Sequence, residues 1–478
     1  MQSPLISCPL RLHVRLLAVS FVFALLSSWT QATAPFPELV DPHPEPGNSF
    51  GHSVVPLSTG NVVITAPFDN AGGDGAGAVY LFNGATGALI STLRGASPYD
   101  AIGLDGVTAL SNGNFVIKSA SWGNADVLDA GAVTWGSGTT GVSGVVSASN
   151  SLVGSSEYDM VGYKLSQDDT VTVLSNGNYL VRSPRWANGA APYAGAITWG
   201  SGTSGISGTI SATNSLVGSS AGDGVGADGF DGNLVLLNNG NYVVASFSWN
   251  NGAASNAGAV TWGSGTTGVK GAISATNSLV GSKADDSVGF YGIVKLTNGN
   301  YVVCSAAWDN GATLNVGAVT WGSGTSALTG VVSSTNSLIG TSTDDQVGYF
   351  GRVIPLTNGH YVVNSPDWRN GAVARVGAVT WCNGTTGLSG LVSTTNSLVG
   401  VVSNDRLGSK GVTALTNGNY VVSSPMVRSL MWAQRRGAAA RLAGPARSQS
   451  PTASLAAQRA IRCQTMASLP SATATFSS

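Results

Sequence analysis

The chain has 478 residues, of which 65 are glycine and only 9% are charged. Such a composition disfavours long amphipathic helices and favours short strands joined by tight turns. All 23 acidic residues lie between Glu38 and Asp405, and residues 35–425 hold 13 Lys or Arg, which gives this part a net charge of −10. An acidic body of this kind argues against a nucleic-acid partner, because phosphates are bound by cationic side chains.

The N-terminus has the pattern of a secretory signal peptide, which we place at residues 1–34. Arg11 and Arg15 precede an apolar run, Leu16–Leu26, and the small residues Ala32 and Ala34 follow it. The apolar run is too short to span a bilayer comfortably, so we expect export and no membrane insertion of the mature body. The sequence therefore predicts a secreted or extracellular protein, with the cell surface as one location. Residues 35–47 form a Pro-rich segment before the main domain.

A short turn motif repeats along the rest of the chain at spacings of 53 to 64 residues. Its seven copies are Gly60-Asn61, Gly113-Asn114, Gly177-Asn178, Gly240-Asn241, Gly299-Asn300, Gly359-His360 and Gly418-Asn419. Self-similarity at a fixed period is the signature of a repeat protein. We therefore assign residues 48–425 to one repeat domain with units of about sixty residues.

Each unit reads as four short strands. In residues 292–340, β-branched residues flank an Asn-Gly pair, a strong hairpin signal because the turn needs positive φ. The expected strands are Ile293–Leu296, Tyr301–Ser305, Gly317–Trp321 and Gly330–Ser333, and Asn336–Gly340 closes the unit. We predict an all-β fold, a β-propeller with six complete blades and a partial seventh; a β-solenoid is the alternative.

The first unit resembles the FG-GAP repeat of integrin-α-type propellers. The resemblance rests on Phe50-Gly51, Thr65-Ala66-Pro67 and Gly77–Phe82. Later units, with Val288-Gly289 or Ser365-Pro366 at these places, are more similar to a bacterial repeat family of unknown function found in secreted, haemagglutinin-like surface proteins. FG-GAP units often carry a calcium loop rich in Asp between their first two strands. The corresponding turns of this chain, such as Leu110–Asn114 and Leu415–Asn419, hold no carboxylate, so we expect no metal and no cofactor.

No catalytic set recurs in the repeat. The four histidines, His13, His43, His52 and His360, occupy unrelated positions, and nucleophilic catalysis has no candidate. Adjacent carboxylates occur at Asp168-Asp169, Asp285-Asp286 and Asp344-Asp345. One Asp recurs at the same repeat position, as Asp159, Asp223, Asp286, Asp345 and Asp405, and such a residue typically caps backbone N–H groups in a turn. We predict that the protein is not an enzyme.

Ten of the twelve tryptophans form two series. The second series, Trp135, Trp199, Trp262, Trp321 and Trp381, ends the third strand and is expected to pack between units. The first series lies in Trp-x-Asn loops that are expected at the same end of the sheets as the Asp turns. Its candidate ligand-binding residues are Trp186, Asn188, Trp249, Asn251, Trp308, Asn310, Trp368 and Asn370. The alternative is that each ring packs under its own loop and that the Asn forms the turn.

These features favour an adhesin-like recognition or surface-display scaffold whose partner is a glycan or a cell-surface protein. A carbohydrate-active enzyme using the Asp pairs and a purely structural array are the alternatives.

Residues 426–478 have no Asp or Glu but seven Arg, and the repeat stops abruptly before them. We expect a disordered tail, read from repeats in a shifted frame. When the third base of each codon is joined to the first two bases of the next, Met466–Phe476 permits Gly-Val-Thr-Ala-Leu-Ser-Asn-Gly-Asn-Phe. Those ten residues stand at Gly106–Phe115.

Overall fold

The computed structural model describes residues 37–124, 127–163, 169–227 and 234–424, together with the backbone of residues 430–431 and 440–443. The predicted signal peptide and most of the predicted frameshifted tail lie outside these residues. The described residues form 33 strands and no helix, so none of their elements is a helix that could cross a membrane.

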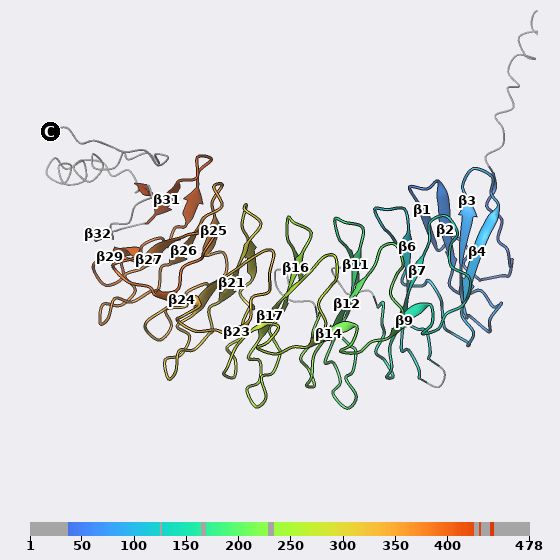
Figure 1. Cartoon of the computed structure of the whole chain (residues 1–478), viewed down its shortest axis with the longest axis horizontal. Coiled ribbons are helices and arrows are strands. Elements are labelled where there is room, and N and C mark those ends of the chain that lie inside the picture. The colour runs from blue at the N-terminus through green and yellow to red at the C-terminus, as the bar shows by residue number, and fades with distance from the viewer. Residues whose placement is uncertain are drawn as a thin grey trace, which may run out of the picture.

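The strands assemble into six five-stranded sheets and one three-stranded sheet. In Figure 1 the sheets follow one another in a curved row from β1 to β31, and the two ends of the row lie far apart. The all-β prediction is confirmed, as is the count of six full units and a partial one. Within the described residues the row does not close into a ring.

The strands fall into five classes by their place in the unit. The first strands are β1 (Ser53–Pro56), β5 (Val107–Ala109), β10 (Val171–Val173), β15 (Leu234–Leu236), β20 (Ile293–Lys295), β25 (Val353–Pro355) and β30 (Val412–Ala414). The second strands are β2 (Asn61–Ala66), β6 (Phe115–Ser119), β11 (Tyr179–Ser183), β16 (Tyr242–Ser246), β21 (Tyr301–Ser305), β26 (Tyr361–Ser365) and β31 (Tyr420–Ser423). The third strands are β3 (Ala78–Asn83), β7 (Ala132–Gly136), β12 (Ala196–Gly200), β17 (Ala259–Gly263), β22 (Ala318–Gly322) and β27 (Ala378–Cys382).

Two further classes complete the sheets. The crossing strands are β8 (Gly144–Val145), β13 (Gly208–Thr209), β18 (Gly271–Ala272), β23 (Gly330–Val331) and β28 (Gly390–Leu391). The last strands are β4 (Leu89–Arg94), β9 (Ser151–Val153), β14 (Ser215–Val217), β19 (Leu279–Val280), β24 (Ser337–Ile339) and β29 (Ser397–Gly400). Two short strands, β32 (Leu430–Met431) and β33 (Ala440–Ala443), follow.

The crossing strand joins the sheet of the preceding unit. β23 pairs in parallel with β19 of the preceding unit. The other strands of its own unit form a different sheet, with the order β20-β21-β22-β24-β28. The prediction that Gly330–Ser333 is the fourth strand of its own sheet is therefore wrong. Ser337–Ile339, predicted as a closing segment, takes that place because its three residues are buried and Ser337 Oγ lies 2.7 Å from Thr320 Oγ1 of the third strand.

Neighbouring units are also joined through one glycine carbonyl. Gly324, in the turn after β22, accepts hydrogen bonds from two amides and one indole of the preceding unit. The donors are Asn239 Nδ2 at 2.7 Å, Asn241 Nδ2 at 2.9 Å and Trp262 Nε1 at 3.1 Å. The same three-donor pattern recurs at Gly202, Gly265 and Gly384. We call these four residues the acceptor glycines.

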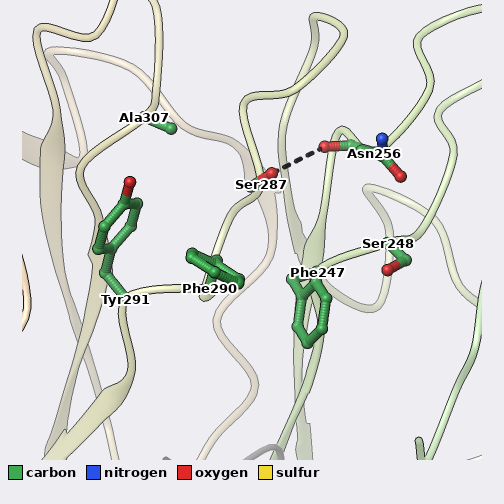
Figure 2. A pocket seen from close by; sticks show the side chains of 7 residues that line it. All are labelled: Phe247, Ser248, Asn256, Ser287, Phe290, Tyr291 and Ala307. Atoms are coloured by element: carbon green, nitrogen blue, oxygen red, sulfur yellow. Dashed lines mark hydrogen bonds between the residues drawn. The ribbon is translucent and has the colours of Figure 1, made fainter. Parts of the chain in front are cut away.

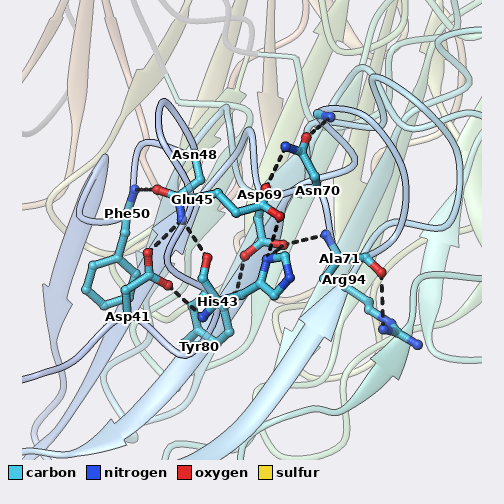
Figure 3. A network of polar contacts seen from close by, with 11 residues as sticks. Asp41, His43, Glu45, Asn48, Phe50, Asp69, Asn70, Ala71, Tyr80 and Arg94 are labelled. Atoms are coloured by element: carbon cyan, nitrogen blue, oxygen red, sulfur yellow. Dashed lines mark hydrogen bonds and ion pairs between the residues drawn. The ribbon is translucent and has the colours of Figure 1, made fainter.

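The Pro-rich segment and the residues after it cover the first sheet. Leu39 and Phe50 pack against the buried side chains of β2 and β3. Figure 3 shows the polar network above them, in which Tyr80 donates to Asp69 at 2.6 Å and His43 Nδ1 lies 3.4 Å from the same carboxylate. Asp69 is fully buried, and burial beside this carboxylate raises the pKa of the Tyr80 hydroxyl. The segment therefore covers the end of the core that lies at the first described sheet.

The acceptor glycines make the turn asparagine important only where a following unit is present. Asn241→Ala removes a donor to Gly324 and an acceptor for Gly265 N, which lies 3.0 Å away. We expect the free energy of unfolding to fall by about 1–3 kcal/mol. The matched variant is Asn419→Ala, because the Asn419 side chain has no hydrogen-bond acceptor in the described residues; its effect should stay within about 0.5 kcal/mol. Urea unfolding of the full chain measures both, and equal effects would contradict the prediction.

Candidate functional site

The first tryptophan series is buried. Trp186, Trp249, Trp308 and Trp368 are 2–4% exposed. Trp308 packs with Val243 and Val260 of the preceding unit, and the bond from Trp308 N to Ser305 O, 3.2 Å long, turns the loop at this point. The prediction that these four rings line an open binding face is therefore wrong, since a ring inside the core cannot stack on a ligand.

The asparagines of the Trp-x-Asn loops serve the backbone. Asn188 Nδ2 donates to Gly218 O and Asn251 Nδ2 donates to Gly281 O, both at 2.9 Å. Asn310 and Asn370 form backbone bridges within the same loops, to Thr313 and Val373. These contacts shape the loop and bring no group of asparagines together around a cavity.

The second tryptophan series lies between units, as predicted. Each ring is partly exposed, and in four of them the indole nitrogen donates to the acceptor glycine of the next unit. The next unit also leaves space for the ring: a Cβ built on Gly205 would lie 2.6 Å from Trp135 Cβ, and the φ of +72° at Gly205 favours glycine independently. The first series, expected at an open face, is thus more deeply buried than the second series.

The recurring Asp caps backbone N–H groups, which confirms the prediction. Asp286 is fully buried, and its Oδ2 accepts from Ser282 N and Lys283 N at 2.9 Å. Its Oδ1 accepts from Asp309 N of the next Trp-x-Asn loop at 3.0 Å. Burial raises the pKa of Asp286 while the three N–H donors oppose this shift. The expected proximity of the Asp turns and the Trp-x-Asn loops is also confirmed.

The adjacent Asp residues do not form paired carboxylates. Asp286 and Asp345 face inward, whereas Asp285 and Asp344 are exposed with φ near +63°. The exposed members accept from Asn256 Nδ2 at 3.0 Å and from Asn315 Nδ2 at 3.1 Å. Asp168 lies outside the described residues, and Asp169 binds Lys118 Nζ at 2.7 Å. The described residues also contain no cluster of three metal-ligating side chains.

The body of the chain holds two cysteines, and each occurs in only one unit. Cys304 and Cys382 are free and buried, and burial raises the pKa of each thiol to about 12. A thiol of this kind is unreactive at neutral pH.

An aromatic cluster that the sequence analysis missed lies at the surface of three consecutive units. Phe290 is 5.2 Å from Phe247 and 5.7 Å from Phe350 between ring centroids. Tyr291 is 5.3 Å from Tyr349 and 4.9 Å from Phe350. All five rings are partly or largely exposed, with Tyr349 at 41%. We call Phe247, Phe290, Tyr291, Tyr349 and Phe350 the aromatic cluster.

A pocket of about 300 Å³ opens beside the aromatic cluster. Figure 2 shows Phe247, Phe290 and Tyr291 along it, with Asn256 and Ser287 opposite the rings. Ser287 Oγ donates to Asn256 O at 3.5 Å. The pocket therefore combines aromatic faces with amide and hydroxyl groups and has no charged lining residue.

Small residues on the second strands accompany the aromatic cluster. Position 245 is Ala, and a Cβ built on Gly289 would lie 3.2 Å from its side chain. The equivalent residues of the earlier units are Lys118 and Arg182, which are buried. The available signal was the aromatic pair that directly follows Val-Gly in only two units, Phe290-Tyr291 and Tyr349-Phe350.

The fold and its repeated loops define a β-repeat protein in which each unit completes the sheet of the one before. The family described as "Repeat of unknown function (DUF5650)" matches residues 109–163, 173–227, 236–290, 295–349, 355–409 and 414–442. These matches cover more than half of the chain, and the chain belongs to this family. The resemblance to a repeat family of unknown function is thus confirmed, and the FG-GAP resemblance stays a prediction.

Among solved structures, the chain is similar to a putative 6-phosphogluconolactonase from Bacteroides uniformis. The sequence identity is 14% and the TM-score is 0.24, over 71% of this chain and 83% of that chain. At this level the likeness carries no argument about fold or activity. No curated protein matches the chain.

The buried Asp and its exposed neighbour allow a matched test of capping. Asp286→Asn replaces one acceptor oxygen by an NH₂ group that faces N–H donors. We expect the free energy of unfolding to fall by about 1–3 kcal/mol. Asp285→Asn changes an exposed group and should cost less than about 0.5 kcal/mol. Urea unfolding of both variants measures the difference, and a larger effect at Asp285 would overturn the assignment.

His360 replaces the turn asparagine in one unit, and its Nδ1 accepts from Gly384 N at 3.1 Å. This bond needs a neutral ring, and burial lowers the pKa of His360 below its ordinary 6.5. The folded state therefore binds the His360 proton less well than the unfolded state. The stability contributed by neutral His360 is present above the unfolded pKa and is lost as the pH falls through the folded pKa. Between about pH 7 and pH 5, His360→Asn should therefore lose less stability than the natural chain. Urea unfolding at both pH values checks this, and parallel losses would contradict it.

Proposed function

We propose that the protein is a non-catalytic recognition scaffold, adhesin-like and exported, and that its ligand is a carbohydrate bound at the aromatic cluster. The observation that carries the proposal is the concentration of five exposed or partly exposed rings on three neighbouring units, beside a pocket. Other exposed rings, such as Tyr99, Tyr158 and Tyr193, lie outside this cluster.

The chemistry of the site suits an uncharged sugar. Aromatic faces pack against the C–H faces of sugar rings, and the Asn256 and Ser287 side chains can bond hydroxyl groups. The net charge of −10 in residues 35–425 disfavours acidic glycans and nucleic acids, which it would repel. A cluster that crosses three units also favours a ligand of several sugar units, extended along the row.

A non-catalytic role fits the carboxylates. Glycoside cleavage commonly needs two carboxyl groups on opposite sides of one bond. In this chain the buried members of the Asp pairs are occupied by backbone N–H groups, and the exposed members bind neighbouring asparagines. The alternative partner, a cell-surface protein, would use the same rings.

The test compares two tyrosines in different units. Tyr291→Ala should abolish or reduce glycan-array binding at least tenfold, because it removes the ring between the pocket and Tyr349. The matched control is Tyr163→Ala, since Tyr163 is exposed, follows Val-Gly like Phe290 and lies outside the aromatic cluster. Binding that is unaffected by Tyr291→Ala, or lost equally in both variants, would overturn the assignment. Hydrolysis of a bound polysaccharide by the natural chain would favour the enzyme.

A further inference from the structure

The last described unit departs from the strand pattern of the others. β31 pairs in parallel with β33, whereas each of the six other second strands pairs antiparallel with a third strand. β29 pairs antiparallel with β32, whereas the other five last strands receive a parallel crossing strand. Among the described residues, neither pairing therefore has the direction that the repeat uses.

The side of the sixth sheet that faces the last unit carries two side-chain donors, Asn358 Nδ2 and Trp381 Nε1. In the earlier units the equivalent donors bond to an acceptor glycine. Asn358 Nδ2 donates to Gly418 O at 3.2 Å instead of to an acceptor glycine. In the described residues, Trp381 Nε1 has no counterpart of the bond that Trp321 Nε1 makes to Gly384 O at 2.9 Å. A third strand followed by a turn with an acceptor glycine would give Trp381 Nε1 an acceptor, and would give Asn358 Nδ2 the kind of acceptor that its counterparts use.

We propose that this face receives the missing third, crossing and last strands of the seventh unit, and that residues 426–478 encode these strands in a shifted reading frame. The occupant follows from the repeat. In each of the six complete units a third and a last strand complete the sheet, and the last strands of the first five units also pair with a crossing strand of the next unit. A second copy of the chain is a poorer fit, since Leu39 and Phe50 cover its first sheet.

Residues with a single codon fix part of the shifted sequence. Met is ATG and Trp is TGG, so Met426-Val427 gives Gly and Met431-Trp432-Ala433 gives Val-Gly when the third base of each codon begins the shifted codon. These residues have the order and spacing of Gly371 and Val376-Gly377 in the preceding unit. None of the three depends on a choice among synonymous codons.

Synonymous codons allow the rest of the unit. Residues 432–443 permit Gly-Ala-Ala-Thr-Trp-Gly-Ser-Gly-Thr-Thr-Gly, which differs from Gly131–Gly141 only by Ala for Val. This stretch supplies a third strand, its tryptophan and an acceptor glycine. Residues 451–457 then permit Asn-Ser-Leu-Val-Gly-Ser, the last strand, and Met466–Phe476 permits the next hairpin. The matches occur in one frame and in the order of the repeat.

Two measurements test the proposal. The codons of residues 426–478 should spell these repeats in the shifted frame, and codons that do not would overturn it. The chain as written is then compared with a chain whose frame is restored after Ser424. The restored chain should resist proteolysis after residue 412 at least tenfold longer and unfold at a higher urea concentration. Equal resistance in both chains would also overturn the proposal.

A pair of substitutions separates docking from a general gain in stability. Trp381→Phe should lower the urea midpoint of the restored chain much more than that of the chain as written, because the indole has no acceptor among the described residues and the restored chain supplies one. Trp321→Phe, whose acceptor Gly384 is present in both chains, should lower both midpoints equally. A Trp381→Phe effect of the same size in both chains would contradict the docking geometry.

Discussion

The carbonyl oxygen of each acceptor glycine is the contact that sets one unit against the next. At Gly324 it receives two amides and one indole from the preceding unit, more donors than a carbonyl with two lone pairs usually accepts. Only glycine fits at this position, because a Cβ built on Gly324 would clash with Gly299 O in the hairpin turn of the same unit. The Asn-Gly-Asn turn, the Ser-Gly-Thr turn and the tryptophan that ends the third strand are therefore parts of one joint.

The opposite side of each unit boundary is held by a buried carboxylate. Asp286 accepts hydrogen bonds from its own turn and from the backbone of the next Trp-x-Asn loop. These bonds help to hold Trp308 of that loop inside the core. With both sides of the boundary fixed by repeated residues, other positions are free to differ between units. Ala245 and the aromatic pair Phe290-Tyr291 use that freedom, and this is how a repeated scaffold can carry one local binding site.

Much of the local structure could be predicted from the sequence, because its causes are local. The hairpin at Asn298-Gly299 follows from positive φ, and the capping role of Asp286 follows from its place before Val-Gly. The burial of Trp308 could not be predicted, since it depends on which neighbouring sheet the loop folds against. The two-residue strand Gly330–Val331 was assigned to the wrong sheet because its partner is some fifty residues earlier. The aromatic cluster escaped a search for recurring residues because it does not recur.

The crossing strand has a consequence for how such arrays can be shortened, lengthened or recombined. Each five-stranded sheet receives its outer strand from the residues that follow its own unit; β28 of the next unit, for example, pairs with β24. The boundaries of the sequence repeat therefore differ from the boundaries of the sheets. A cut at the end of a sequence repeat exposes the backbone edge of a last strand, which is a template for self-association. A cut just after a crossing strand completes the preceding sheet but removes the last strand of its own unit, as a cut after β28 would separate β27 from β29. A shortened or recombined array therefore needs, at either kind of cut, a terminal segment that covers the exposed strand edge.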